Sequence, residues 1–309
     1  MDRKGCGRLL LAAGLAALLA GCGRERLPAQ APSGKRTIIA TYAVLGAVVQ
    51  ELVGDAFTVR SAIPNGLDVH EWEPSAKDIE ALTRADLIVE NGLGLEGGMG
   101  KALDQARQAG VQVFTAAAHI RVRRVGAGEG IPSGDPDQAA GAKDPHLWTD
   151  PLAVKAVLDA LAADLRQRFG VDLSARQADL DARLAALDAQ IRAKAQALPA
   201  SRRKLVTGHE SLGYWAQRYG FTLVGAVIPS LTTEAESSAA GLEALKRLID
   251  RNQVTGVFTE LGTPPRTLEA LARESRVKAV TLATHGLPPD GSYFTFERNL
   301  SDSILDALR

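Results

Sequence analysis

Apolar and polar positions alternate in blocks along most of the chain. Eight short runs are apolar on both faces, and helical stretches separate them. These runs occupy residues 38–45, 57–63, 87–91, 111–117, 204–207, 221–228, 254–260 and 277–284. Buried runs that alternate with helices are typical of parallel sheets built from βα units. Because four runs precede residue 150 and four follow residue 200, the pattern predicts an α/β protein with two domains. Each domain is expected to hold a four-stranded, mainly parallel sheet flanked by helices.

Two helical segments lie between these groups of strands. Asp150 followed by Pro151 is a typical helix start, with an N-cap and a proline in the first turn. A second helix is predicted over 174–198 from apolar residues at helical spacing. That stripe consists of Leu180, Leu184, Leu187, Ile191 and Leu198. A helix of about 25 residues is roughly 37 Å long, so it would join the domains as one long rigid helix.

The predicted divisions follow from these helices. They are an N-terminal α/β domain over 36–172, a linking helix over 173–199 and a C-terminal α/β domain over 200–309.

The first 22 residues have the character of an export signal. Three basic residues precede an apolar run over 9–20, which is too short to cross a bilayer as a helix but suits a signal peptide. The run ends in Leu-Ala-Gly-Cys, which resembles a bacterial lipobox with Cys22 as the lipidated residue. The alternative is an ordinary secretory signal with an incidental cysteine. We therefore predict a lipoprotein signal peptide over 1–21, a polar tether over 22–35, and an extracytoplasmic protein anchored by lipid to a bacterial membrane, in the periplasm or at the cell surface.

Charge and cysteine content narrow the possible chemistry. The chain has 36 basic and 36 acidic residues, and loss of 1–21 leaves 33 basic against 35 acidic, a net charge of −2. This balance argues against nucleic-acid binding, which favours a basic excess. Cys6 would leave with the signal and Cys22 would carry lipid, so the folded part holds no cysteine. Any metal site must use nitrogen and oxygen donors.

Four of the five histidines lie in loops where chemistry is expected. His70, His209 and His285 follow predicted strands, and His146 lies just before the helix that starts at residue 150. Ligands of open α/β sheets bind outside the carboxyl ends of the strands, so these side chains are expected to converge between the domains. The alternative is that each is an ordinary surface or core histidine, but four such coincidences are improbable. His119 has no carboxylate or proline nearby and is interpreted as a bystander.

Several of these segments resemble a known family. IPNGLDVHEWEPS (63–75) with ADLIVENGLGLE (85–96), DPHLWTDP (144–151) and TGHESLGYW (207–215) are similar to signatures of the zinc and manganese solute-binding lipoproteins of ABC transporters, the cluster A-I family. The resemblance covers the whole chain after the predicted signal peptide. It implies two α/β domains, one long rigid linking helix, and a metal ion bound between the domains.

The resemblance also implies a set of ligands. His70, His146 and His209 match the first three ligand positions, and a histidine at the third position is typical of the zinc branch. The fourth position is usually an Asp after the last strand, where this chain has His285. Imidazole donors favour zinc, copper and nickel, so the expected cargo is Zn(II). Glu260 or a water molecule remains an alternative fourth ligand.

Carboxylates near these histidines are candidates to orient them, because metal-bound imidazoles usually donate their second N–H to a carboxylate or carbonyl. The candidates are Glu71, Glu73, Asp144, Asp150, Glu210 and Glu260. Asp150 is better explained as a helix N-cap. Glu260, at the carboxyl end of a predicted strand, is the favoured orienting residue or spare ligand.

Together these features predict a monomeric zinc-binding protein, not an enzyme, that captures Zn(II) between its domains and delivers it to an ABC permease. One alternative is the same scaffold carrying manganese, iron or copper, and another is an adhesin or metal buffer without a permease. A secreted zinc hydrolase is disfavoured because neither His70 nor His209 begins an H-E-x-x-H motif; Pro74 and Gly213 occupy the last position.

Overall fold

The structure, a computed structural model, describes residues 34–126, 129 and 139–309. The predicted signal peptide, Cys22 and nearly all of the tether lie outside the described residues. In the described part of the chain, no helix has both the length and the apolar character needed to cross a membrane. Residues Lys35–Arg309 form one compact unit.

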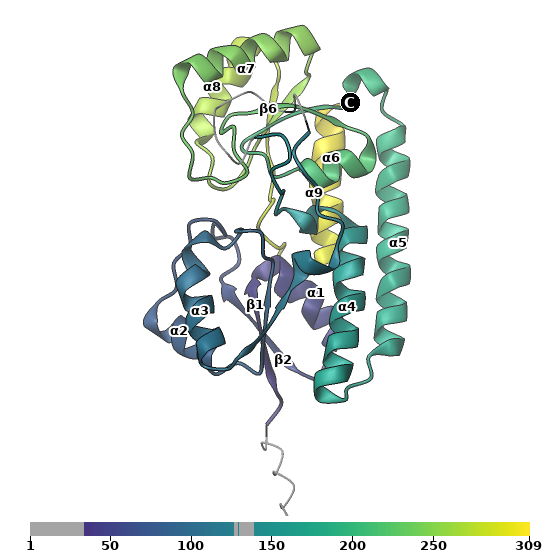
Figure 1. The fold of residues 1–309 in the computed structure, drawn as a ribbon. Helices are drawn as coiled ribbons and strands as arrows, with labels where there is room; N and C mark the ends of the chain where they lie inside the picture. Colours follow the sequence, from purple (N-terminus) through teal and green to yellow (C-terminus); the bar gives the residue numbers. More distant parts are fainter. Residues whose placement is uncertain (1–33, 127–128, 130–138) are drawn as a thin grey trace, which may run out of the picture. The chain divides into compact units, whose positions relative to one another are not determined.

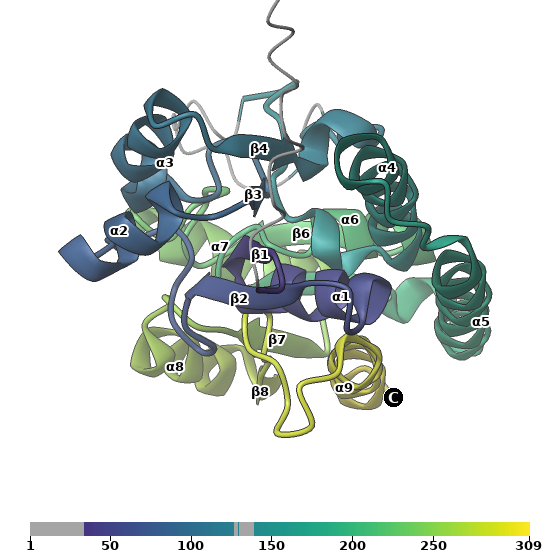
Figure 2. The ribbon, with the colours of Figure 1, turned by 90° about the horizontal axis from the view of Figure 1, so that it is seen from below.

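The first half of this unit contains the predicted four-stranded parallel sheet, in the order β2-β1-β3-β4 (Figures 1 and 2). Its strands are β1 (Thr37–Tyr42), β2 (Thr58–Ile63), β3 (Leu87–Glu90) and β4 (Gln112–Thr115). The helices between them are α1 (Ala43–Val53), α2 (Ala76–Thr83) and α3 (Gly100–Gln108), and short 3-10 turns lie at η1 (Gly97–Met99) and η2 (Ala116–His119). The α/β fold class predicted from the sequence is thus confirmed for this half.

The first predicted strand was too long at its carboxyl end. The apolar run continues to residue 45, but the backbone becomes helical at Ala43. Ala43, Val44 and Leu45 are buried in α1 just as the strand residues are buried in β1. A run that is buried on every side carries no periodicity that separates strand from helix, and this explains the error.

Two long helices follow the first sheet: α4 (Pro151–Phe169) and α5 (Ser174–Gln196), which are preceded by the turn η4 (Leu147–Thr149). The Asp150 carboxylate accepts a hydrogen bond from Leu152 N at 2.8 Å, so α4 begins at the predicted N-cap. Every residue of the predicted leucine stripe is buried. Burying a leucine side chain contributes about 1.5–3 kcal/mol, and here it holds α5 against α1, α4, α6 and α9 (Figure 1).

The second half differs from the prediction in its sheet. Its strands are β5 (Lys204–Thr207), β6 (Thr222–Ala226), β7 (Gly256–Thr259) and β8 (Lys278–Thr281). They pair as two separate parallel sheets, β5-β6 and β7-β8, and not as one four-stranded sheet. β5 lies beside β7 without a hydrogen-bonded ladder, and the β5-β6 register shifts between Leu205 and Val206.

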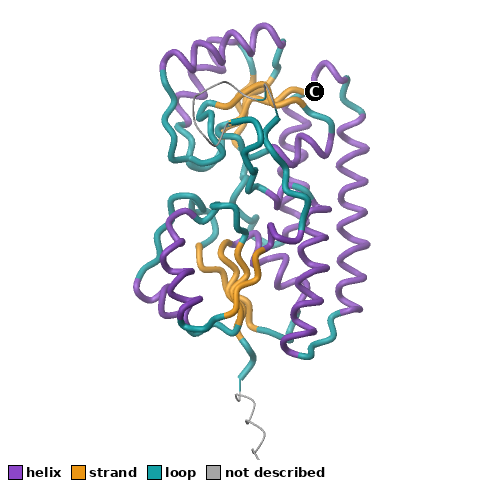
Figure 3. The backbone as a smooth tube through the Cα atoms, in the orientation of Figure 1, coloured by secondary structure: helices purple, strands orange, loops and turns teal. Residues whose placement is uncertain are grey.

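The remaining helices are α6 (Gly213–Tyr219), α7 (Ala239–Asn252), α8 (Pro265–Ser275) and α9 (Tyr293–Ala307), with a short turn at η5 (Ala200–Arg202). α6 and α9 bury Trp215 and Tyr293 in the same apolar core as the first sheet, α4 and α5. A smaller core, with Leu245 and Val257 among its members, lies between α7, α8 and the second group of strands. The domain borders expected at residues 172 and 200 stay a prediction. Loops occupy the space between the two groups of strands (Figure 3).

Candidate metal centre

Four histidines from four separate loops meet in the interior of the protein. His70 follows β2, His209 follows β5, His285 follows β8, and His146 immediately precedes η4. Each offers a ring nitrogen, and these four nitrogens all lie within 4.8 Å of one another. All four residues are at most 3% exposed. Three loops at the carboxyl ends of strands and the loop before η4 thus bring together the four histidines that the sequence singled out.

Two of the distances between the nitrogens match those around a small tetrahedral ion. His146 Nε2 lies 3.4 Å from His70 Nε2 and 3.3 Å from His209 Nε2. A tetrahedral zinc ion with Zn–N bonds of 2.0–2.1 Å separates its nitrogen donors by about 3.3–3.4 Å. The Nε2 atom of His285 is buried and has no hydrogen-bond partner among the described residues. It is therefore free to be the fourth donor.

Buried carboxylates fix the orientation of two of the rings. His146 Nδ1 lies 2.9 Å from Asp144 Oδ1, and His209 Nδ1 lies 3.2 Å from Glu260 Oε1. An ionised carboxylate only accepts hydrogen bonds, so His146 Nδ1 carries the proton and His146 Nε2 presents a lone pair. His209 Nδ1 faces Glu260 within ion-pair distance, without a hydrogen bond of good geometry. Two lone pairs that face each other at 3.3 Å repel unless a proton or a cation lies between them.

Glu260 occupies the orienting position that the sequence favoured for it. Its Oε1 accepts a hydrogen bond from His209 N at 3.0 Å, and its Oε2 accepts one from Ser211 Oγ at 2.5 Å. Burial opposes ionisation of Glu260, but the neighbouring His209 outweighs burial and lowers the pKa of Glu260 to about 2. Glu260 is therefore a carboxylate at neutral pH.

The contact between Glu260 and His209 also changes the pKa of His209. Burial alone would lower the pKa of His209, but Glu260 outweighs this effect and raises that pKa above its usual value. His209 is thus the one imidazole of the four whose pKa is raised, and it is the natural holder of a proton when no metal is bound.

The other three imidazoles are held neutral, which is the form that binds metal. Burial, together with the three neighbouring rings, lowers the pKa of His70 well below its usual value. Burial also lowers the pKa of His146, although Asp144 opposes the effect. For His285 burial lowers the pKa to about 3, and its Nδ1 lies 2.9 Å from Thr284 Oγ1.

Two other candidates and the predicted bystander lie apart from the four rings. Glu71 is exposed to solvent directly after His70. Asp150 caps α4, and its carboxylate lies 3.3 Å from Arg218 Nε. His119, the predicted bystander, stacks on Phe114 with ring centroids 4.5 Å apart and is not part of the group.

A buried polar network that the sequence analysis did not identify supports the His146 loop. Asn91 Nδ2 donates to Pro145 O at 2.8 Å, and Tyr42 Oη donates to Asn91 Oδ1 at 2.9 Å. Glu96 accepts from Asn91 N and Thr41 Oγ1, each at 2.6 Å. The only signal in the sequence was polar residues next to a buried strand. Their partners lie about 50 residues away, beyond the reach of any local pattern.

Trp148 covers one side of the histidine group. Its ring centroid is 5.3 Å from that of His146 and 5.3 Å from that of His285. Its indole Nε1 donates to Thr284 O at 2.8 Å, which joins the loops of both histidines. A large apolar ring in this position excludes water and strengthens electrostatic interactions at the site.

Known proteins resemble this chain over almost all of its described length. A family model described as "ZnuA: Zinc-uptake complex component A periplasmic" matches residues 38–307. Zinc-binding protein TroA of Treponema pallidum is 32% identical over 246 residues, which cover 78% of this chain and 75% of TroA. The TroA structure superposes with a TM-score of 0.77 and 27% identity, over 89% of this chain and 99% of that one.

Two further relatives are named for different metals. The zinc-binding lipoprotein AdcA of Streptococcus pneumoniae is 28% identical over 89% of this chain, a match that spans 54% of AdcA. The manganese-binding lipoprotein MntA of Bacillus subtilis is 26% identical over 87% of this chain and 84% of MntA. The family match covers far more than half of the sequence. The chain therefore belongs to the ZnuA family, the periplasmic A components of zinc-uptake complexes.

Proposed function

We propose that this protein captures one Zn(II) ion with His70, His146, His209 and His285 and delivers it to an ABC permease. The observation that carries the proposal is the pair of inward-facing Nε2 contacts, at 3.3 and 3.4 Å, inside a buried group of four imidazoles. Neutral nitrogen lone pairs this close together repel one another, and carboxylates lie behind two of the rings. The arrangement is therefore suited to binding one cation that all four rings share.

The donor set supports zinc over manganese. Four imidazoles and no carboxylate match the ligands that zinc prefers, whereas manganese favours oxygen donors. TroA and AdcA are named as zinc-binding proteins, and MntA as a manganese-binding one. Manganese binding by this chain is therefore the alternative that the test must include.

Such a centre suits a protein that transports zinc and not one that uses zinc in catalysis. Catalytic zinc sites keep one coordination position open for water or substrate, whereas this group offers four protein donors. With four donors in place, the ion has no vacant position at which water could be activated.

The setting we propose is extracytoplasmic. The protein would be a monomer anchored by lipid on Cys22, with the permease in the same membrane as its partner. AdcA and MntA are both named lipoproteins, which supports this part of the proposal.

Titration calorimetry with Zn(II) and Mn(II) tests the proposal. The protein is expected to bind one Zn(II) per chain and to bind Mn(II) far more weakly. His146→Ala should abolish tight zinc binding, while His119→Ala, which changes a histidine stacked on Phe114 away from the group, should leave it unchanged. Equal loss in both variants, or a preference for Mn(II), would contradict the proposal.

A further inference from the structure

The side chain of Asp68 connects the loop that carries His70 to the second half of the chain through two hydrogen bonds. Asp68 Oδ1 accepts a hydrogen bond from His70 N at 2.9 Å. Asp68 Oδ2 accepts one from Thr233 Oγ1 at 2.9 Å, across the boundary between the first sheet and the second half. The Asp68 carboxylate thus binds both the backbone of His70, a proposed metal ligand, and Thr233 in the second half of the chain.

A glycine shows how closely this contact is packed. Gly262, in the loop after β7, has a backbone φ of +80°. A Cβ atom at this position would come within 2.2 Å of Asp68 Oδ2 and 2.5 Å of Thr233 Cγ2. Any side chain would push the two partners apart, so this position is compatible only with glycine while the contact is made.

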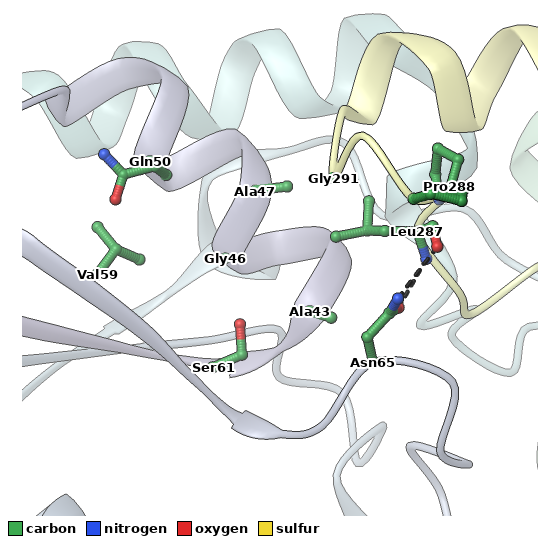
Figure 4. A pocket seen from close by; sticks show the side chains of 11 residues that line it. Ala43, Gly46, Ala47, Gln50, Val59, Ser61, Asn65, Leu287, Pro288 and Gly291 are labelled. Carbon is green, nitrogen blue, oxygen red and sulfur yellow. Dashed lines mark hydrogen bonds between the residues drawn. The ribbon is translucent and has the colours of Figure 1, made fainter.

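A second fastening lies at the other end of the same loop. Asn65 Nδ2 donates to Leu287 O at 3.0 Å, and Leu287 N donates to Asn65 Oδ1 at 2.7 Å (Figure 4). Leu287 lies two residues after His285, so this pair connects the loops of two proposed ligands. The pair is exposed, beside an open hollow lined by Ala43, Ala47 and Pro288.

These two fastenings differ from the contacts on the other side of the histidines. There Trp148 Nε1 donates to Thr284 O at 2.8 Å, and Tyr293 Oη donates to Trp148 O at 2.9 Å, both fully inside the apolar core. Hydrogen bonds near solvent exchange readily with water, whereas buried ones do not. A centre that is at most 3% exposed must open for an ion to pass, and the His70 loop is held to the second half by an exposed pair, Asn65–Leu287, and a part-buried one, Asp68–Thr233.

We propose that Asp68 is a positioning residue that sets the rate of metal release, by tying the His70 loop to Thr233. This inference rests on the proposed function. Asp68 touches no metal-binding atom; it acts through His70 N on one side and Thr233 on the other. A permease that displaces this loop would release the ion without unfolding the buried side of the centre.

The test is the rate at which excess EDTA removes zinc from the loaded protein, followed by tryptophan fluorescence. Trp148 lies against two of the proposed ligands, so its emission is expected to report occupancy. Thr233→Val keeps the shape of the side chain and removes the hydroxyl, and it should speed zinc loss about tenfold. Thr233→Ser keeps the hydroxyl and should restore the wild-type rate. Thr232→Val, on the same loop but bonded to Ser230, is the matched control and should lose zinc at the wild-type rate.

Two further measurements separate the possible outcomes. The thermal midpoint of the metal-free Thr233→Val protein should fall by no more than about 2–4 °C, the cost of one hydrogen bond, because a wider structural role would lower it further. Asn65→Ser, at an exposed position, should also speed zinc loss if the loop is the moving segment. An unchanged rate in both Thr233→Val and Asn65→Ser, with wild type loading zinc normally, would overturn this inference alone. Failure of wild type to load zinc would overturn the proposed function, and this inference with it.

Discussion

Asp144 Oδ1 lies 2.9 Å from His146 Nδ1, and both side chains are fully buried. The same oxygen accepts from His146 N at 2.9 Å, and Asp144 Oδ2 accepts from Arg123 Nη1 at 3.0 Å. Arg123 therefore holds the carboxylate, and the carboxylate holds the ring. This chain of contacts leaves the His146 Nε2 lone pair pointing at the other imidazoles.

Replacing Asp144 by asparagine should weaken zinc binding by about 10–100-fold, the usual effect of losing a carboxylate behind a metal-bound histidine. The amide keeps the shape of the side chain but no longer favours the proton on Nδ1. Competition with a chelator of known affinity measures the effect. Asp104→Asn, which alters an exposed partner of Arg107, is the control and should leave zinc affinity unchanged.

Zinc affinity should fall as the pH falls. His209 has a raised pKa, so below that pKa one proton must leave this ring for each zinc bound, and the apparent affinity should drop about tenfold per pH unit. The pKa values of the other three rings are lowered, so these rings compete little over the same range. Chelator competition between pH 7.5 and about pH 5.5 measures the slope. An affinity independent of pH would show that protonation of His209 does not oppose binding.

His285 should govern the choice of metal. His285→Ala is expected to weaken zinc binding at least tenfold, about 1.4 kcal/mol, because it removes one of four donors. His285→Asp should recover much of this loss and improve manganese binding, since it adds an oxygen donor. Calorimetry with both metals measures the change. If zinc affinity is unchanged in His285→Ala but lost in His70→Ala, then Glu260 or water is the fourth ligand.

Metal loading should move the two groups of strands very little. α5 is continuous from Ser174 to Gln196 and packs on helices from both halves of the chain. Bending it would break its backbone hydrogen bonds and separate the apolar core that α6 and α9 share with the first sheet. X-ray scattering with and without zinc should give the same radius of gyration. A clear contraction on loading would contradict the rigid connection.

The elements of the fold that local periodicity encodes could be predicted from the sequence. The stripe from Leu180 to Ile191 identified α5 because each turn of that helix repeats the same burial, although α5 ends at Gln196 and Leu198 lies just beyond it. The end of β1 and the absence of a ladder between β5 and β7 could not be predicted. The first depends on a buried run without periodicity, and the second on how two strands far apart in the sequence lie beside each other.

Parts of the candidate site could also be predicted from the sequence, and other parts could not. His70, His209 and His285 stood out because strand ends of α/β proteins gather side chains at one place, and His146 because it precedes a predicted helix start. Asp144 and Glu260, which lie against the rings of His146 and His209, were also among the candidates. The support of the His146 loop by Asn91 was not visible, because Asn91 and Pro145 are 54 residues apart in the sequence and only the folded backbone brings them together. Asp68 lay inside a recognised motif, yet its contact with Thr233 spans 165 residues and no local pattern predicts it.

X-ray absorption at the zinc edge of the loaded protein is the sharpest test of a four-histidine centre, because it counts the atoms bound to the ion. We expect four nitrogen donors at about 2.0–2.1 Å, with the multiple-scattering pattern of four imidazole rings. His285→Ala should reduce the imidazole count to three. An oxygen donor in the wild-type protein, from water or from Glu260, would contradict a centre made of four histidines.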